Sequence, residues 1–191
     1  MQLAKPVLLS LTVAAFTVLS AGASPLPGAA PNAGVSPDES GAHSLGAGAP
    51  TVAAAASPIY GIELPPGYRQ WELVSVSYEA PFDEFRGILG NPTAMAAYRA
   101  GLSPFPDGSE LVKLAWKRTP LAELEGAFVP GAATTVQVML KDSQKFAASG
   151  GWGFGRFVNG VPADEAQHLT CFACHDAKVK DRDFVFTRLA P

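Results

Sequence analysis

Polar and hydrophobic positions alternate along four short segments of the chain, which is the pattern of half-buried β-strands. The predicted strands cover residues 72–78, 110–117, 134–140 and 152–158. The third segment is rich in β-branched residues, and the fourth follows a pair of glycines. A Pro/Gly-containing turn is predicted at 104–108, just before the second strand.

Two short helices are predicted between these strands and after them. Residues 94–100 follow a cap-like Asn-Pro-Thr entry and end at Gly101, as helices commonly do. A second helix is expected over 163–170, with Pro162 in its first turn. Strands outnumber helices and no βαβ alternation occurs, so we expect an antiparallel α+β domain.

The first 23 residues have the composition of a secretory signal peptide. Lys5 supplies a positive start, residues 7–19 are mostly apolar, and residues 21–23 form a small-residue Ala-Gly-Ala cleavage site. The apolar run is short for a transmembrane helix and no charged flank follows it. We therefore expect an exported, periplasmic protein.

Residues 24–57 are dominated by Ala, Gly, Pro and Ser, with too few large apolar groups to bury a core. We interpret this segment as a linker, followed by one folded domain over 58–191. The formal net charge is −3 and no Lys/Arg patch occurs, so a nucleic-acid partner is not expected.

The two cysteines of the chain, Cys171 and Cys174, are followed at once by His175. C-x-x-C-H is the attachment signature of a c-type haem, in which two thiols add to the haem vinyl groups and the histidine binds the iron. We expect one covalent haem c, held by Cys171 and Cys174 with His175 as axial ligand. Export fits this chemistry, because c-type haem is attached outside the bacterial cytoplasm.

Other uses of a C-x-x-C pair fit the sequence less well. A dithiol redox centre usually opens a helix in a βαβ unit, which is missing here. A zinc site would need a second Cys/His cluster, and a disulfide across so small a loop would stabilise the fold only modestly.

Five further segments, in this order and ahead of the C-x-x-C-H motif, carry a family resemblance. They are residues 68–71 (YRQW), 88–91 (ILGN), 105–108 (FPDG), 139–142 (MLKD) and 150–154 (GGWGF). Together they resemble the cytochrome P460 family, which includes the cytochromes c′-beta. The resemblance implies a mostly β, often homodimeric domain with one five-coordinate haem. Its enzymes carry a lysine cross-linked to the porphyrin and oxidise hydroxylamine to nitrous or nitric oxide, whereas c′-beta members bind nitric oxide.

Lys113 is the candidate for the cross-link. It follows the Pro-Asp-Gly turn, where the family lysine lies, and it shares a strand face with Leu111 and Ala115. An amine attacks only when unprotonated, so burial beside the ring would favour the reaction by lowering the pKa. Lys117 is one pleat further along and ranks second.

A proton-accepting carboxylate is harder to find. In the family's enzymes a glutamate precedes the Met-x-Lys-Asp block, but no Asp or Glu occurs between positions 126 and 141 of this chain. We expect Val138 to line the distal side of the haem and Phe82 and Phe85 to cap it, giving an apolar pocket. Asp83 or Glu84 could reach into the pocket from this segment, but both are expected to be solvated surface groups.

The sixth coordination position is expected to be open. Met95 and Met139 could ligate iron but belong to apolar patterns typical of core residues. His168 lies seven residues before His175, on the same side of the ring, and is expected at the surface. Three functions follow: hydroxylamine oxidation with a cytochrome as electron acceptor, nitric oxide binding, or electron transfer with methionine as sixth ligand.

Overall fold

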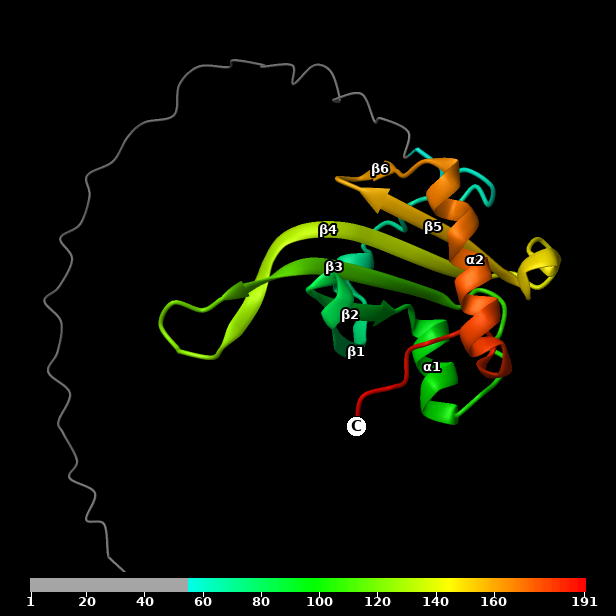
Figure 1. The fold of residues 1–191 in the computed structure, drawn as a ribbon. Helices are drawn as coiled ribbons and strands as arrows, with labels where there is room; N and C mark the ends of the chain where they lie inside the picture. The colour runs from blue at the N-terminus through cyan, green and yellow to red at the C-terminus, as the bar shows by residue number, and fades with distance from the viewer. Residues whose placement is uncertain (1–54) are drawn as a thin grey trace, which may run out of the picture. The chain divides into compact units, whose positions relative to one another are not determined.

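The computed structural model describes residues 55–191, whose central element is a six-stranded sheet with its strands in sequence order. All neighbouring strands are antiparallel, and two α-helices complete the domain (Figure 1). The strands are β1 (Glu72–Glu79), β2 (Glu84–Gly90), β3 (Glu110–Pro120), β4 (Phe128–Lys141), β5 (Trp152–Val158) and β6 (Val161–Pro162), and the helices are α1 (Pro92–Ala100) and α2 (Glu165–Val179). The predicted antiparallel α+β class is confirmed. The predicted signal peptide and the first part of the linker lie outside the described residues.

All four predicted strands are present, and two strands, β2 and the two-residue β6, were not predicted. β2 reads EFRGILG, and its two glycines obscure the alternation that identifies a strand. Packing explains Gly90, because a Cβ there would lie 2.9 Å from the Met95 sulfur and 3.1 Å from Val74. The first predicted helix corresponds to α1, whose N-cap is the side chain of Asn91.

The second helix differs from its prediction in both bounds. α2 begins at Glu165 and runs through the C-x-x-C-H motif to Val179, whereas the sequence suggested a helix ending before the motif. Its N-cap is Asp164, whose carboxylate accepts a hydrogen bond from the Gln167 N–H at 2.8 Å. Pro162 belongs to β6 instead.

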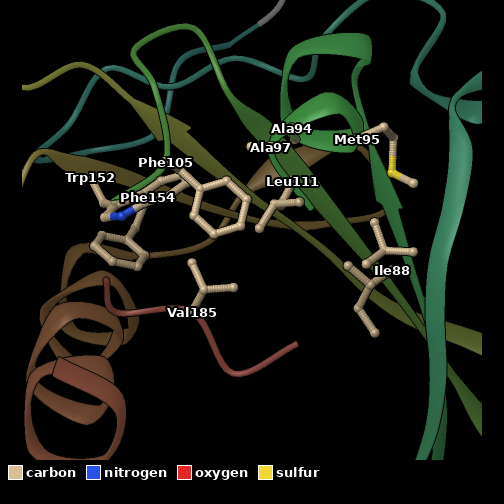
Figure 2. Packing of buried hydrophobic residues seen from close by; sticks show 10 residues of the cluster. Ile88, Ala94, Met95, Ala97, Phe105, Leu111, Trp152, Phe154 and Val185 are labelled. Atoms are coloured by element: carbon tan, nitrogen blue, oxygen red, sulfur yellow. The ribbon is translucent and has the colours of Figure 1, made fainter. Parts of the chain in front are cut away.

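The two faces of the sheet pack against different parts of the chain. The face that we call the α2 face carries Ile88, Leu111 and Phe154, and Cys171 and Phe172 of α2 pack against this cluster. Figure 2 shows Phe105, Trp152 and Phe154 grouped together, with Val185 of the C-terminal segment facing them.

The opposite face carries a second cluster, covered by residues that precede the sheet. Its buried members are Ile62, Leu89, Val112, Leu114, Val138, Phe146 and Phe157. No helix within residues 55–191 is long and apolar enough to span a membrane.

The domain's first contacts are made by Ser57, which the sequence had placed at the end of the linker. Ser57 is buried, and its hydroxyl donates a hydrogen bond to the Phe154 carbonyl at 3.2 Å. It also accepts one from the Ile62 N–H at 3.0 Å. The folded unit therefore includes Ser57.

Candidate haem-binding site

The C-x-x-C-H motif lies in the middle of α2, where helical geometry sets the spacing of its side chains. Positions three and four apart on a helix are neighbours on its surface, so Cys171 lies beside both Cys174 and His175. Cys171 is partly buried against the α2 face, Cys174 is exposed, and both are free thiols. Burial raises the pKa of the Cys171 thiol, although Arg156 and Lys113 oppose this effect. The helix thus presents two unpaired thiols and an imidazole along one side.

The tautomer of His175 follows from a single contact. Its Nδ1 lies 2.6 Å from the backbone carbonyl oxygen of Phe184, and a carbonyl can only accept a hydrogen bond. Nδ1 therefore carries the proton, and the Nε2 lone pair is left for a metal. Burial lowers the pKa of His175, the bond to Phe184 opposes this, and Lys113 adds to the lowering, so the neutral form required of a ligand is favoured.

Two aromatic rings fix the plane of the imidazole. Phe154 of β5 meets it edge-on with ring centroids 5.0 Å apart, and Phe186 does so at 4.9 Å. With the tautomer and ring plane both set, and both thiols on the same helix surface, these residues fit the demands of a covalently held haem.

Lys113 lies on the α2 face of the sheet. It is directly opposite Ile88 of β2 and Gln137 of β4, and Gln137 is opposite Arg156 of β5. Because side chains of directly paired residues point to the same face, these four form one row across the sheet. Ile88 belongs to the cluster that packs against Cys171, so the row lies on the side of the sheet where the motif is.

The surroundings of Lys113 are strongly cationic. Burial, together with the charges of Arg86 and Arg156, lowers the pKa of Lys113 to about 8. The charges of Glu84 and Cys171 act in the opposite direction. Lys113 is therefore a partly buried lysine that gives up its proton more readily than an exposed one, as the cross-link hypothesis requires. Lys117, the second candidate, is half exposed and donates a hydrogen bond to the Phe82 carbonyl at 2.7 Å.

Glu84 is not the solvated surface group that the sequence suggested. Its side chain is only 13% exposed and lies 3.2 Å from the Arg86 guanidinium. By strand alternation it shares the α2 face with Arg86 and Ile88. Asp83 does lie at the surface, where its carboxylate accepts hydrogen bonds from Tyr78 at 2.7 Å and Arg118 at 2.8 Å.

The three expected pocket residues are not brought together. Val138 is buried in the cluster of the opposite face, and Phe85 also points to that face, where its ring lies 5.5 Å from that of Tyr78. Phe82 is 56% exposed and lies under the Arg86 guanidinium, at the rim of the α2 face. The expected pocket of these three residues is therefore not formed on the α2 face, where the row that contains Lys113, Gln137 and Arg156 is polar and the neighbouring cluster is apolar.

Two methionines and one histidine are further potential iron ligands in the sequence. Met95 is fully buried in α1, and Met139 packs at the edge of the same cluster. His168 is not at the surface but fully buried. Its Nε2 accepts a hydrogen bond from the backbone N–H of Arg156 at 3.0 Å, and its Nδ1 donates one to the backbone carbonyl of Asp164 at 2.8 Å. Both ring nitrogens of His168 are therefore used in joining α2 to β5.

Sequence reasoning missed one buried ion pair near the motif. Lys141 Nζ lies 2.7 Å from Asp183 Oδ1, and the side chains are 6% and 8% exposed. Lys141 also donates to the Gly150 carbonyl at 3.1 Å. The Met-Leu-Lys-Asp block pointed to this lysine, but no pattern in the sequence identified Asp183 as its partner.

The paired thiols and the oriented imidazole on a helix that packs against an antiparallel sheet define a haem-binding cytochrome. The family model for Cytochrome P460 matches residues 65–187. The chain belongs to the cytochrome P460 family, and its cofactor is a haem with its iron. No curated protein matches the chain.

Proposed function

We propose that this protein is an exported haem c enzyme that oxidises hydroxylamine to nitrous or nitric oxide. Cys171 and Cys174 would hold the haem covalently, and His175 Nε2 would bind its iron. The haem would supply a redox-active iron for the substrate nitrogen. The observation that carries the proposal is the placement of Lys113 on the α2 face, within electrostatic reach of Cys171.

Lys113 has the properties of a cross-linking residue. With a pKa of about 8, about a tenth of its amine is unprotonated at pH 7, far more than for an exposed lysine. The position is also fixed, because β3 is paired on both sides and Lys113 has a partner in each neighbouring strand. Such an amine would be positioned to attack the edge of a haem held by the motif. Joining its nitrogen to a porphyrin carbon replaces one N–H and one C–H bond and releases two protons and two electrons, which a two-electron oxidant such as hydrogen peroxide would accept.

Glu84 is the proton acceptor that we assign to the reaction. Oxidation of hydroxylamine to either product releases one proton with every electron, so a nearby base assists turnover. Among the residues of the α2 face, Glu84 supplies a largely buried carboxylate whose charge is felt by Lys113. Electrons leave to a separate cytochrome in the periplasm, and a homodimer is the proposed assembly.

Steady-state hydroxylamine consumption with an artificial electron acceptor tests the proposal. Wild-type protein should turn over, and its haem peptide should include a mass increment linking the Lys113 peptide to the porphyrin. Lys113→Met should lose the cross-link and the absorption spectrum of the cross-linked haem. Lys117→Met on the same strand should keep both. Glu84→Gln should retain the cross-link and lose about 100-fold in rate. Glu79→Gln removes the other carboxylate at Arg86 and should have little effect.

One observation favours a second candidate, a nitric oxide-binding protein without turnover. The side chain directly across from Lys113 is Gln137, whose amide can donate a hydrogen bond to a bound ligand but cannot take up a proton at neutral pH. An ordinary c-type spectrum, an unmodified Lys113 peptide and no hydroxylamine consumption, together with reversible nitric oxide binding, would replace the first proposal by this one.

A further inference from the structure

We propose that the buried Lys141–Asp183 ion pair positions the carbonyl group that polarises His175, and so sets the electron donation of this ligand to the haem iron. The inference rests on the proposed role of His175 as axial ligand and does not depend on hydroxylamine turnover. Lys141 and Asp183 are positioning residues, because neither reaches the metal.

The first step is the hydrogen bond at His175. Nδ1 donates to the Phe184 carbonyl across 2.6 Å, a short contact for an N–H donor. A hydrogen bond at this nitrogen gives the ring partial imidazolate character and makes Nε2 a stronger donor. The strength of the bond depends on how firmly the Phe184 carbonyl is held.

The second step is the backbone that presents this carbonyl. Asp183 and Phe184 have φ values of 49° and 61°, so two consecutive non-glycine residues adopt the left-handed conformation. That conformation is unfavourable for a residue such as phenylalanine and persists only where other contacts enforce it. It reverses the chain after α2 and returns the Phe184 carbonyl to His175.

The contacts that enforce the reversal converge on Asp183. Its Oδ1 binds Lys141 Nζ at 2.7 Å, and its Oδ2 accepts a hydrogen bond from the Phe105 N–H at 2.8 Å. Lys141 is held in turn by the Gly150 carbonyl at 3.1 Å. The end of β4 and two loops of the sheet domain therefore fix the segment that faces the ligand.

The ring of Phe184 is held by the same loop. A Cβ placed on Gly150 would overlap the Phe184 ring, so glycine at this position is what allows the ring to pack there. Gly150 thus contributes its carbonyl to Lys141 and space to Phe184. The ion pair is therefore linked to Phe184 in two ways: through the backbone by Asp183, and through the ring by Gly150. We call these contacts the His175 network.

The test compares two substitutions with opposite effects on charge, using the full-length haem-loaded protein. Asp183→Asn removes a negative charge, and Lys141→Met removes a positive one. If the pair acts by position, both weaken the Phe184–His175 bond. Both variants should then lower the iron–histidine stretching frequency of the ferrous protein in resonance Raman spectra and raise its midpoint potential.

A purely through-space effect of charge predicts the opposite pattern for the potentials. Loss of the Asp183 charge would raise the potential, but loss of the Lys141 charge would lower it, because a cation disfavours ferric iron. Potentials that move in opposite directions, or stretching frequencies unchanged in both variants, overturn the inference. Lys141→Arg keeps the charge and the ion pair, and its frequency should lie closer to that of the wild type than that of Lys141→Met does.

Asp83→Asn is a matched control. Asp183 follows a short 3₁₀-helix, η4 (Lys180–Arg182), and Asp83 likewise follows one, η2 (Ala80–Phe82). Asp83 also has a φ of 52° and forms an ion pair, with Arg118 at 2.8 Å. Asp83 has no contact with the His175 network. The iron–histidine stretching frequency and the midpoint potential of Asp83→Asn should therefore equal those of the wild type. If Lys141→Met does not fold, the iron–histidine stretching frequencies of Asp183→Asn and Lys141→Arg still test the inference. The frequency of Asp183→Asn should be lowered, and that of Lys141→Arg should lie closer to the wild-type value. A wild-type protein that takes up no haem would overturn the proposed function as well, whereas the outcomes above bear on this inference alone.

Discussion

At the scale of single residues, burial of the charged Lys113 amine destabilises the folded chain by an amount that depends on pH. The pKa of this amine is lowered from 10.5 to about 8, with burial as the largest cause. Below pH 8 the amine is protonated in both folded and unfolded states, and the folded state carries the full penalty of burying the charge. Between pH 8 and 10.5 only the unfolded state still binds the proton, so the penalty disappears as the pH rises.

The haem-free Lys113→Met variant should therefore be more stable than the haem-free wild type at pH 7, by about 2–3 kcal/mol. The difference should shrink between pH 8 and pH 10.5, as measured by urea unfolding across this range. Lys117→Met removes an exposed positive charge from the same strand and should show no comparable gain at pH 7. A difference for Lys113→Met that does not change with pH would contradict the titration of a buried amine.

The sequence identified the residues of the motif better than those of the pocket. Cys171, Cys174 and His175 could be named because their chemistry depends on local spacing, which a helix preserves. Lys113 could be placed on a face by strand alternation. Val138 and Phe85 could not, since which face of the sheet α2 covers is a tertiary fact, and the same alternation leaves them on the wrong side for the proposed pocket. The burial of His168 and Glu84 likewise depends on partners far away in the sequence.

At the scale of elements, local signals predicted the strands and the start of α1 but not the extent of α2. The Asn-Pro-Thr entry placed the start of α1 within two residues and Gly101 gave its end correctly, because capping is decided by neighbouring residues. In α2 the sequence around the motif is not strongly apolar, so its helical continuation depends on packing against β5 and on the Asp164 cap. β2 was missed for a related reason, since Gly90 makes room for the side chains of Met95 and Val74, which belong to other elements.

Asn91 joins α1 to the sheet as well as capping it. Its Oδ1 accepts hydrogen bonds from the N–H groups of Ala94 at 2.9 Å and Glu110 at 3.1 Å, and its Nδ2 donates to the Gly108 carbonyl at 2.8 Å. Asn91→Ala should lower the free energy of unfolding by about 2–3 kcal/mol. Asn91→Asp keeps the acceptor but loses the donor, and should recover roughly half of that loss. Equal stabilities of the two variants in chemical denaturation would show that the bonds to Oδ1 contribute little.

At the scale of the whole molecule, the sheet separates two functions of its side chains. The opposite face is closed by residues 60–71 and by apolar side chains that stabilise the fold. The α2 face combines an apolar part near β5, which seats α2, with the polar row that contains Lys113 and Gln137. The pattern of strands and helices predicted a single domain of this class. The different roles of the two faces follow from the register of six strands and are not visible in any one segment.

The N-terminal boundary of the folded unit offers a test at this scale. Ser57 makes four hydrogen-bonded contacts: its hydroxyl with the Phe154 carbonyl and the Ile62 N–H, its own N–H with the Ile62 carbonyl at 2.6 Å, and its carbonyl with the Gly61 N–H at 3.0 Å. The resulting turn seats Ile62 over β5, where a Cβ on Gly153 or Gly155 would lie 2.9 Å from it. The turn therefore holds the first residues of the domain against β5, the strand on whose other face α2 packs.

A chain that starts at residue 55 should fold with this turn intact, whereas one that starts at residue 59 should be less stable by about 2–3 kcal/mol, because it loses the Ser57 bonds and loosens Ile62. Ser57→Ala in the longer chain separates the two contributions, since it removes only the hydroxyl bonds and should cost about 1 kcal/mol. Thermal and urea unfolding of the three chains measures both losses. Identical unfolding curves for the chains from 55 and 59 would mean that the domain begins after the Ser57 turn and that Ile62 is held by the sheet alone.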